Sequence, residues 1–226
     1  MLVTQKMQKT YELVVFDWDG TLMDSAAHIV TSMQRALKEL DLPVLPREKI
    51  RDIIGLGLRE AIMRLLPDCD DDLLLMITDR YRHHFFTDDP CEPFAGAEQV
   101  LQHLHGAGYL LAVATGKGRQ GLDRVLRSTG FSQYFVETRC ADEAHSKPHP
   151  QMLLEIMDIL GVDAKHTLMV GDTEYDLNMA NAANTAAVGV DYGVHSRERL
   201  MACSPLACLS SITELPEWLV NETNTL

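Results

Sequence analysis

The sequence has no apolar run long enough to cross a lipid bilayer, and it has few basic residues. Its 226 residues include 33 Asp and Glu but only 20 Lys and Arg, which gives a formal net charge of −13. Sequence-independent binding of nucleic acid needs a basic face, so we expect no nucleic-acid partner. A membrane-spanning helix needs about 20 successive apolar residues, so we expect no membrane partner. An anionic substrate would need local positive charge or a metal ion.

Cysteine is also scarce, and its five positions are scattered along the chain. No pair of cysteines has the spacing of zinc ligands, which argues against a zinc site or a disulfide framework. Lysines interrupt the first fifteen residues, so we expect no secretion signal. These features favour reduced thiols and a cytoplasmic protein, whose oligomeric state the sequence leaves open.

Short continuous apolar runs recur along the chain and predict buried strands. The strong runs are at 13–16, 110–114, 167–170 and 186–190, and a weaker one is at 134–136. A strand that is apolar at every position is typical of a parallel sheet covered on both faces. Helical stretches lie between these runs. The sequence therefore predicts an α/β fold, with a Rossmann-like parallel sheet flanked by helices.

One connection in this pattern is much longer than a crossover requires. Roughly seventy residues separate the first strand from Ala95, whereas about a dozen would suffice. Several stretches of this segment have helical periodicity, and Gly55-Leu56-Gly57 marks a sharp bend. We predict an α/β core formed by residues 1–24 and 93–226, with an all-helical cap inserted at residues 25–92.

Polar clusters follow the predicted strands. "DWDGT" (17–21) follows the first strand, "TGKGRQG" (115–121) the second and "GDTEYD" (171–176) the fourth, while "SKPHP" (146–150) lies in a loop. Ligands of open α/β sheets bind beyond the carboxyl ends of the strands. We therefore expect these four segments to meet at one site.

Two pairs of carboxylates in these clusters indicate a metal site. Asp17 and Asp19 follow one strand, and Asp172 and Asp176 follow another. Carboxylates that meet without a cation repel one another, and a hard divalent cation such as Mg²⁺ removes that conflict. Asp172 or Thr173 could also cap the following helix, and such a role is compatible with metal binding.

The other two clusters indicate phosphate binding. Thr115 offers a hydroxyl and Gly116 a bare backbone N–H at a strand-to-helix junction, which suits a phosphate oxygen. Lys147 supplies a point positive charge, and Pro148 and Pro150, which follow it, keep its loop extended. Together with the carboxylates, these residues predict a site for a phosphorylated ligand.

In their order along the chain, "DWDGT", "ATGK", "SKP" and "GDTEYD" resemble the four motifs of the haloacid dehalogenase-like hydrolase superfamily. The predicted helical insertion resembles the cap of the subgroup that includes phosphoglycolate phosphatases. The resemblance implies a Mg²⁺-dependent phosphatase that hydrolyses a small phosphorylated metabolite through an aspartyl-phosphate. The true dehalogenases lack an acid at the position of Asp19, so this residue favours phosphoryl chemistry.

The resemblance also implies a role for each motif residue. Asp17 would be the nucleophile, and Asp19 the general acid and then the base. Asp17, the backbone carbonyl of Asp19 and Asp172 would hold Mg²⁺, with Asp176 as a supporting carboxylate. The phosphoryl oxygens would be bound by Thr115, Gly116, Lys147 and the backbone N–H groups that follow Asp17, beginning with that of Trp18.

The cap offers one candidate for substrate binding. Arg59 follows the Gly55-Leu56-Gly57 bend, and its guanidinium would suit a carboxylate such as that of phosphoglycolate. An exposed arginine beside a helix–helix turn is an equally good interpretation of the same residues.

Three other functions remain open from the sequence. "GKGRQG" (116–121) matches a dinucleotide-binding pattern, and Glu137 has about the spacing of a ribose-binding acid, which would fit an oxidoreductase. Receiver domains of signalling systems also use an acidic pocket and a lysine. Sugar-phosphate mutases such as β-phosphoglucomutase share all four motifs.

Overall fold

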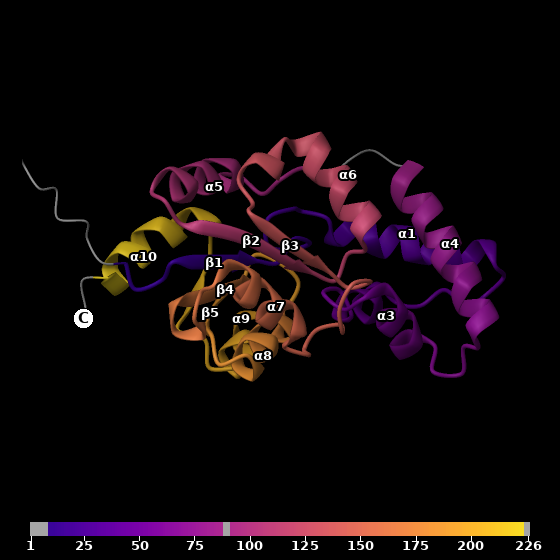
Figure 1. The fold of residues 1–226 in the computed structure, drawn as a ribbon. Helices are drawn as coiled ribbons and strands as arrows, with labels where there is room; N and C mark the ends of the chain where they lie inside the picture. Colours follow the sequence, from indigo (N-terminus) through magenta and orange to yellow (C-terminus); the bar gives the residue numbers. More distant parts are fainter. Residues whose placement is uncertain (1–8, 88–90, 224–226) are drawn as a thin grey trace, which may run out of the picture.

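The computed structural model describes residues 9–87 and 91–223, and a parallel sheet lies at its centre (Figure 1). All neighbouring strands run parallel, in the order β3-β2-β1-β4-β5-β6. The α/β fold class predicted from the sequence is therefore confirmed. The strands are β1 (Leu13–Phe16), β2 (Leu110–Thr115), β3 (Glu137–Cys140), β4 (Thr167–Gly171), β5 (Ala186–Val190) and β6 (Ala207–Leu209).

Helices cover both faces of the sheet. Val14 and Phe16 of β1 belong to one hydrophobic cluster, whereas Leu13 and Val15 belong to another. This alternation arises because successive strand residues point to opposite faces. One face is covered by α5 (Ala97–Gly106), α6 (Arg119–Thr129) and α10 (Leu215–Thr223), and the other by α7 (Gln151–Leu160), α8 (Glu174–Ala182) and α9 (Arg197–Met201).

The register of the three central strands brings their carboxyl ends together. Phe16, at the end of β1, pairs with Val113 of β2 and with Val170 of β4. The Asp17 N–H continues this ladder by donating to the Val170 carbonyl at 2.9 Å. Residues that follow β1, β2 and β4 in the sequence are therefore neighbours at one edge of the sheet.

The helices of residues 26–87 form a separate layer at this carboxyl edge (Figure 1). They pack around a hydrophobic cluster of their own, in which Ile50 and Ile77 are fully buried. This layer is the helical cap. Its helices are α1 (Ala26–Glu39), α2 (Arg47–Asp52), α3 (Leu58–Leu65) and α4 (Asp71–Thr87).

The division of the chain at 24/25 and 92/93 stays a prediction, and the parts of it at residues 1–8, 88–90 and 224–226 lie outside the described residues. Across 9–87 and 91–223, none of the helices combines the length and apolar character that a membrane span requires.

The prediction of a strand at 134–136 is wrong, and the sequence did not predict the sixth strand, β6. The third strand begins at Glu137, after a short turn of 3₁₀-helix at 131–133. It is an edge strand with one neighbour, so the first three of its four side chains are only half-buried, and Arg139 forms an ion pair with Glu137 at 2.7 Å. Polar edge strands lack the apolar signal of central ones. The strand β6 has only three residues and also lies at an edge.

The bend at Gly55-Leu56-Gly57 fastens the cap to the core. A Cβ added to Gly116 would lie 2.5 Å from the carbonyl oxygens of both Gly55 and Leu56. The Gly57 N–H also donates to the Ser146 hydroxyl at 2.7 Å. The core therefore needs glycine at position 116 for the cap backbone to approach this closely.

We expect Gly116→Ala to separate the cap bend from the core and to lower phosphate release by about 10²-fold, since small misplacements at a reacting centre cost this much. The control is Gly106→Ala, because no heavy atom of the described residues, apart from the chain neighbours and the backbone of its own helix, lies within 4 Å of a Cβ added there. Phosphate release and the melting temperature would be measured for both variants. Unchanged activity of Gly116→Ala would contradict the importance of this contact.

Candidate active site

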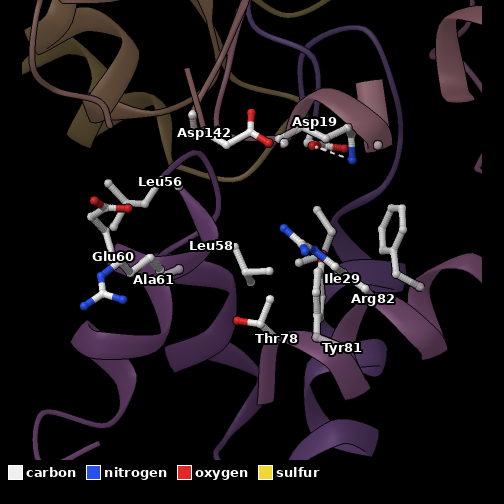
Figure 2. A pocket seen from close by; sticks show the side chains of 18 of the residues that line it. Asp19, Ile29, Leu56, Leu58, Glu60, Ala61, Thr78, Tyr81, Arg82 and Asp142 are labelled. Atoms are coloured by element: carbon white, nitrogen blue, oxygen red, sulfur yellow. Dashed lines mark ion pairs between the residues drawn. The ribbon is translucent and has the colours of Figure 1, made fainter. Parts of the chain in front are cut away.

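A cavity of about 430 Å³ lies between the carboxyl edge of the sheet and the cap. Figure 2 shows it with Asp19 and Asp142 of the core on one side and cap residues on the other. Asp17, Thr115 and Gly116 also line it. Residues from the first two motifs therefore share one cavity, as the sequence predicts.

Lys147, from the third motif, is buried behind Asp17. Its ammonium Nζ lies 2.6 Å from Asp17 Oδ1 and 2.6 Å from Asp176 Oδ1, and the side chains of all three residues are at most 1% exposed. A buried charge is tolerated when it is paired and hydrogen-bonded. Lys147 thus joins the first motif to the fourth.

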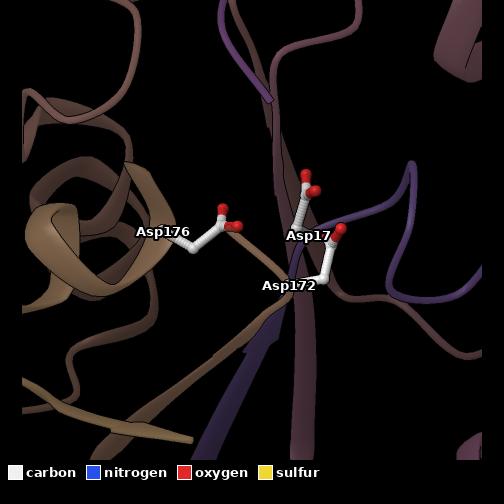
Figure 3. Close-up of side chains that lie close together, drawn as sticks. All are labelled: Asp17, Asp172 and Asp176. Atoms are coloured by element: carbon white, nitrogen blue, oxygen red, sulfur yellow. The ribbon is translucent and has the colours of Figure 1, made fainter. Parts of the chain in front are cut away.

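Three buried carboxylates form a compact acidic cluster (Figure 3). Asp17, Asp172 and Asp176 offer oxygen atoms that all lie within 4.8 Å of one another. Asp172 is held in place because its Oδ1 accepts from the Thr21 hydroxyl at 2.8 Å and its Oδ2 from the Val194 N–H at 2.7 Å. Within the described residues, Asp17 Oδ2 is buried without a hydrogen-bond partner. The acidic cluster therefore contains one carboxylate oxygen that no described residue satisfies.

Burial dominates the electrostatics of this cluster. It raises the pKa of Asp17 to about 7; Lys147 opposes this rise, and Asp176 and Asp19 add to it. Burial, with repulsion by Asp17 and Asp176, also raises the pKa of Asp172 well above its usual range. For Lys147, burial would lower the pKa, but the two adjacent carboxylates outweigh it and raise the pKa. The single positive charge of Lys147 therefore does not neutralise the three carboxylates of the acidic cluster.

Asp176 also shapes the start of α8. Its Oδ2 accepts from the Thr173 N–H at 3.0 Å and from the Thr173 hydroxyl at 2.7 Å, as part of a capping box. Thr173 is the N-cap residue of this helix, so the capping alternative holds for Thr173 and not for Asp172. The capping box of α8 thus fixes the position of the Asp176 carboxylate, which contacts Lys147.

Asp19 lies at the cavity surface, apart from the three-carboxylate cluster. Its Oδ1 accepts from the Ser25 hydroxyl at 2.7 Å, and its Oδ2 forms an ion pair with Lys117 Nζ at 3.0 Å. Lys117 Nζ also lies 4.5 Å from the centre of the Phe85 ring in the cap. Sequence reasoning assigned no role to Lys117, although its place in "ATGK", two residues after Thr115, was a usable signal.

Thr115 and Trp18 offer different atoms to the site. The Thr115 hydroxyl oxygen accepts from the Lys117 N–H at 3.1 Å at the start of the loop. The Trp18 ring is fully buried and packs edge-on against Phe131 and Phe135. Any contact of Trp18 with a phosphoryl oxygen would therefore be through its backbone.

The structure places Arg59 at the cavity wall, but its guanidinium is engaged elsewhere. Arg59 Nη2 forms an ion pair with Asp71 Oδ1 at 2.8 Å, and the Arg59 side chain is 56% exposed. The pair lies within the cap, at its surface. Arg59 is thus not brought together with the motif residues.

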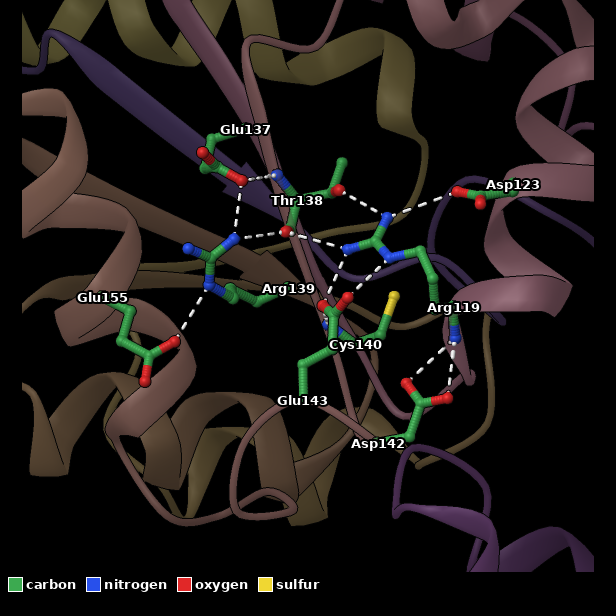
Figure 4. A network of polar contacts seen from close by, with 9 residues as sticks. All are labelled: Arg119, Asp123, Glu137, Thr138, Arg139, Cys140, Asp142, Glu143 and Glu155. Atoms are coloured by element: carbon green, nitrogen blue, oxygen red, sulfur yellow. Dashed lines mark hydrogen bonds and ion pairs between the residues drawn. The ribbon is translucent and has the colours of Figure 1, made fainter.

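Arg119 of the "GKGRQG" loop is engaged in polar contacts within the core (Figure 4). Arg119 donates to Glu143 through Nε and Nη2, and its backbone N–H donates to Asp142. Glu137, the candidate for binding a ribose, instead pairs with Arg139 at 2.7 Å. With Glu137 and Arg119 both engaged, this loop reads as a structural connection between the sheet and α6.

Comparison with known proteins agrees with this geometry. The family model described as haloacid dehalogenase-like hydrolase matches residues 14–190. The chain is 39% identical to "probable phosphatase IndB" of Dickeya dadantii (90% of this chain, 91% of that protein) and 29% identical to a phosphoglycolate phosphatase of Vibrio parahaemolyticus (93% and 96%). A crystal structure of a predicted phosphatase from Clostridium acetobutylicum superposes with a TM-score of 0.84 at 27% identity (93% and 99%). The chain therefore belongs to the haloacid dehalogenase-like hydrolases, resembles phosphoglycolate phosphatases within them, and is a phosphoric monoester hydrolase.

Proposed function

We propose that the chain hydrolyses a small phosphate ester with Mg²⁺ through an aspartyl-phosphate on Asp17. One observation carries the proposal. The carboxylate of Asp17 lies at the wall of the cavity, with Lys147 bound to Oδ1 and with Oδ2 left without a partner in the described residues. This arrangement orients one carboxylate oxygen and leaves the other available for a reaction.

The residues present fit a magnesium ion. Asp17 and Asp172 offer buried carboxylate oxygens of the kind that Mg²⁺ prefers. Burial and repulsion between neighbouring carboxylates raise the pKa of both, and a cation bound between them would relieve that repulsion. The backbone carbonyl of Asp19 completes the proposed ligand set, and Asp176 supports it. A bound Mg²⁺ would reduce the repulsion between Asp17 and the phosphoryl group and would stabilise charge on the phosphoryl oxygens.

In the first step, an Asp17 carboxylate oxygen attacks phosphorus, and the bond from phosphorus to the ester oxygen breaks. Asp19 gives its proton to the departing oxygen, so that the product leaves as a neutral alcohol. Lys147, with the Thr115 hydroxyl and the Gly116 N–H, would bind the phosphoryl oxygens. Splitting the hydrolysis in this way replaces a poorly oriented water by a fixed carboxylate.

In the second step, Asp19 takes a proton from a water molecule that attacks phosphorus. The bond between phosphorus and the Asp17 oxygen breaks, inorganic phosphate leaves and Asp19 regains its proton. Ser25 and Lys117 hold the two oxygens of Asp19 in place. Because Lys117 also packs on Phe85, the position of the acid depends on the position of the cap.

A sugar-phosphate mutase would use the same core residues and is the second candidate function of the site. The two differ in product, since a mutase returns the phosphoryl group to the sugar. Assaying isomerised sugar phosphate against free phosphate separates them.

We expect Asp17→Asn to lower phosphate release by about 10³-fold or more, because the amide lacks the nucleophilic oxygen. Its control is Asp163→Asn, the same substitution at a side chain that is 77% exposed. Phosphate release from p-nitrophenyl phosphate would be measured, with melting curves as a check on folding. Normal turnover by Asp17→Asn would refute the nucleophile assignment.

We expect Asp19→Ala to impair poor leaving groups much more than good ones. An alkoxide needs a proton in order to leave, whereas a nitrophenolate does not, and general acid catalysis contributes about 10²–10⁴-fold. Rates for an alkyl phosphate and for p-nitrophenyl phosphate would be compared. Equal losses on both esters would count against the acid role.

The pKa of Asp17 predicts how metal-free stability depends on pH. Since this pKa rises from about 3.9 in the unfolded chain to about 7, the folded protein binds more protons between these values, and its stability falls as pH rises through that window. Mg²⁺ held by Asp17 and Asp172 would compete with those protons. We therefore expect Mg²⁺, compared with chelator, to raise the melting temperature more at pH 8 than at pH 5.

In Asp17→Asn this difference between the two pH values should shrink, because the residue no longer ionises. A gain from Mg²⁺ that is the same at both pH values in the unsubstituted protein would contradict the assignment of the metal site.

A further inference from the structure

The cavity between cap and core is larger and more apolar than a phosphoryl site requires. Its volume of about 430 Å³ falls within the range of about 300–1,000 Å³ for sites that enclose drug-sized ligands. The cap contributes aliphatic and aromatic side chains to the wall, among them Ile29, Leu58, Leu74, Tyr81 and Phe85. A two-carbon leaving group would contact few of these side chains.

Three cationic side chains line this cavity, and two of them already have partners. Arg59 is paired with Asp71, and Lys117 is paired with Asp19. Arg82, on α4, has no hydrogen bond or ion pair with any residue in 9–87 and 91–223. Of these three cationic side chains, Arg82 is therefore the one without an ion-pair partner in the described residues.

Arg82 is placed to contact a ligand that extends from the phosphoryl site toward the cap. Figure 2 shows its guanidinium pointing into the space between Asp19 and the cap side chains Leu58 and Ile29. Its Nη2 also comes within 3.9 Å of the position that a Cβ on Gly118 would occupy, so the side chain reaches the core loop.

Within the described residues, no acidic side chain of the cavity forms an ion pair with Arg82. Asp142 is near it, since a Cβ on Gly118 would lie 3.0 Å from Asp142 Oδ2 and 3.9 Å from Arg82 Nη2, but Asp142 accepts from the Arg119 N–H instead. An arginine that faces an apolar cavity without an ion-pair partner suits a carboxylate or phosphate group of a ligand, because the guanidinium can donate two parallel hydrogen bonds to two oxygens of that group.

We infer that the substrate is a phosphomonoester of a ring-bearing, largely apolar alcohol with an anionic group at the end far from phosphorus, and that Arg82 binds this group. The inference rests on the proposed function. The apolar wall selects the ring, Arg82 selects the anionic group, and the core residues perform the same reaction on any ester that fits. Phosphoglycolate has the anionic group but lacks the ring.

The test uses three esters of primary alcohols, whose oxygens are similar as leaving groups: ethyl phosphate, benzyl phosphate and 4-carboxybenzyl phosphate. Burial of the ring should raise kcat/KM at least about tenfold from ethyl to benzyl phosphate. The carboxylate should raise it by about another tenfold, as expected for a hydrogen bond between charged groups. Phosphoglycolate should be a poorer substrate than 4-carboxybenzyl phosphate.

Substitution of Arg82 separates specific binding from a general effect of the cap. Arg82→Gln should remove the about tenfold advantage of 4-carboxybenzyl over benzyl phosphate, mainly through KM. The control is Arg80→Gln on the same helix, because Arg80 pairs with Asp79 and Glu39 outside the cavity. Arg80→Gln should keep the advantage. Melting curves of both variants check that each is folded.

Two outcomes would overturn the inference while leaving the proposed function intact. One is a kcat/KM for ethyl phosphate or phosphoglycolate that equals or exceeds the values for the two benzyl esters. The other is an advantage of the carboxylate that survives in Arg82→Gln or disappears in Arg59→Gln instead. Failure of the proposed function looks different, since no ester, including p-nitrophenyl phosphate, would then release phosphate with Mg²⁺.

Discussion

The buried ion pairs of Lys147 are the interaction on which the rest of the site depends. Its ammonium contacts Asp17 and Asp176 at 2.6 Å each, where almost no solvent reaches. Removing one partner from such a group leaves an uncompensated buried charge, which is strongly destabilising. The lysine therefore holds carboxylates from two distant motifs together, but one positive charge does not balance Asp17, Asp172 and Asp176. This surplus of negative charge makes the site suitable for a divalent cation.

The backbone around Asp172 explains how a carboxylate is fixed so closely. A Cβ added to Gly20 would lie 2.2 Å from Asp172 Oδ2, and one added to Gly193 would lie 2.4 Å from the same atom. These glycines leave room for the side chain, and hydrogen bonds from Thr21 and Val194 orient its two oxygens. The carboxylate is thereby held in place before any ligand binds, which is what a preorganised site requires.

Core and cap have separate tasks in this arrangement. In the proposed mechanism, the residues at the ends of β1, β2 and β4 perform the reaction, and the register of the sheet fixes their relative positions. The cap supplies most of the cavity wall, including Arg82, and in the inference drawn above it would select the leaving group. The tight contact of Gly55 and Leu56 with Gly116 and the stacking of Lys117 on Phe85 couple the two parts.

Much of this could be predicted from the sequence. Continuous apolar runs are the signature of central parallel strands. The strands β1, β2, β4 and β5 could therefore be predicted from the sequence, whereas the polar edge strand β3 could not. The motif residues Asp17, Lys147 and Asp172 were identifiable because their chemical types and order along the chain are specific. Their contacts at 2.6–2.8 Å follow from the predicted convergence of strand ends.

The sequence by itself determined the class of fold and the chemical groups at the reacting centre, since both depend on residue type and on spacing along the chain. Only the tertiary structure decided which charges are already paired. Lys117 meets Asp19, and Arg59 meets Asp71, whereas Arg82 meets no partner in the described residues. The physical reason is that an ion pair depends on distance through space, and helices of the cap bring together residues whose separation in the sequence carries no such signal.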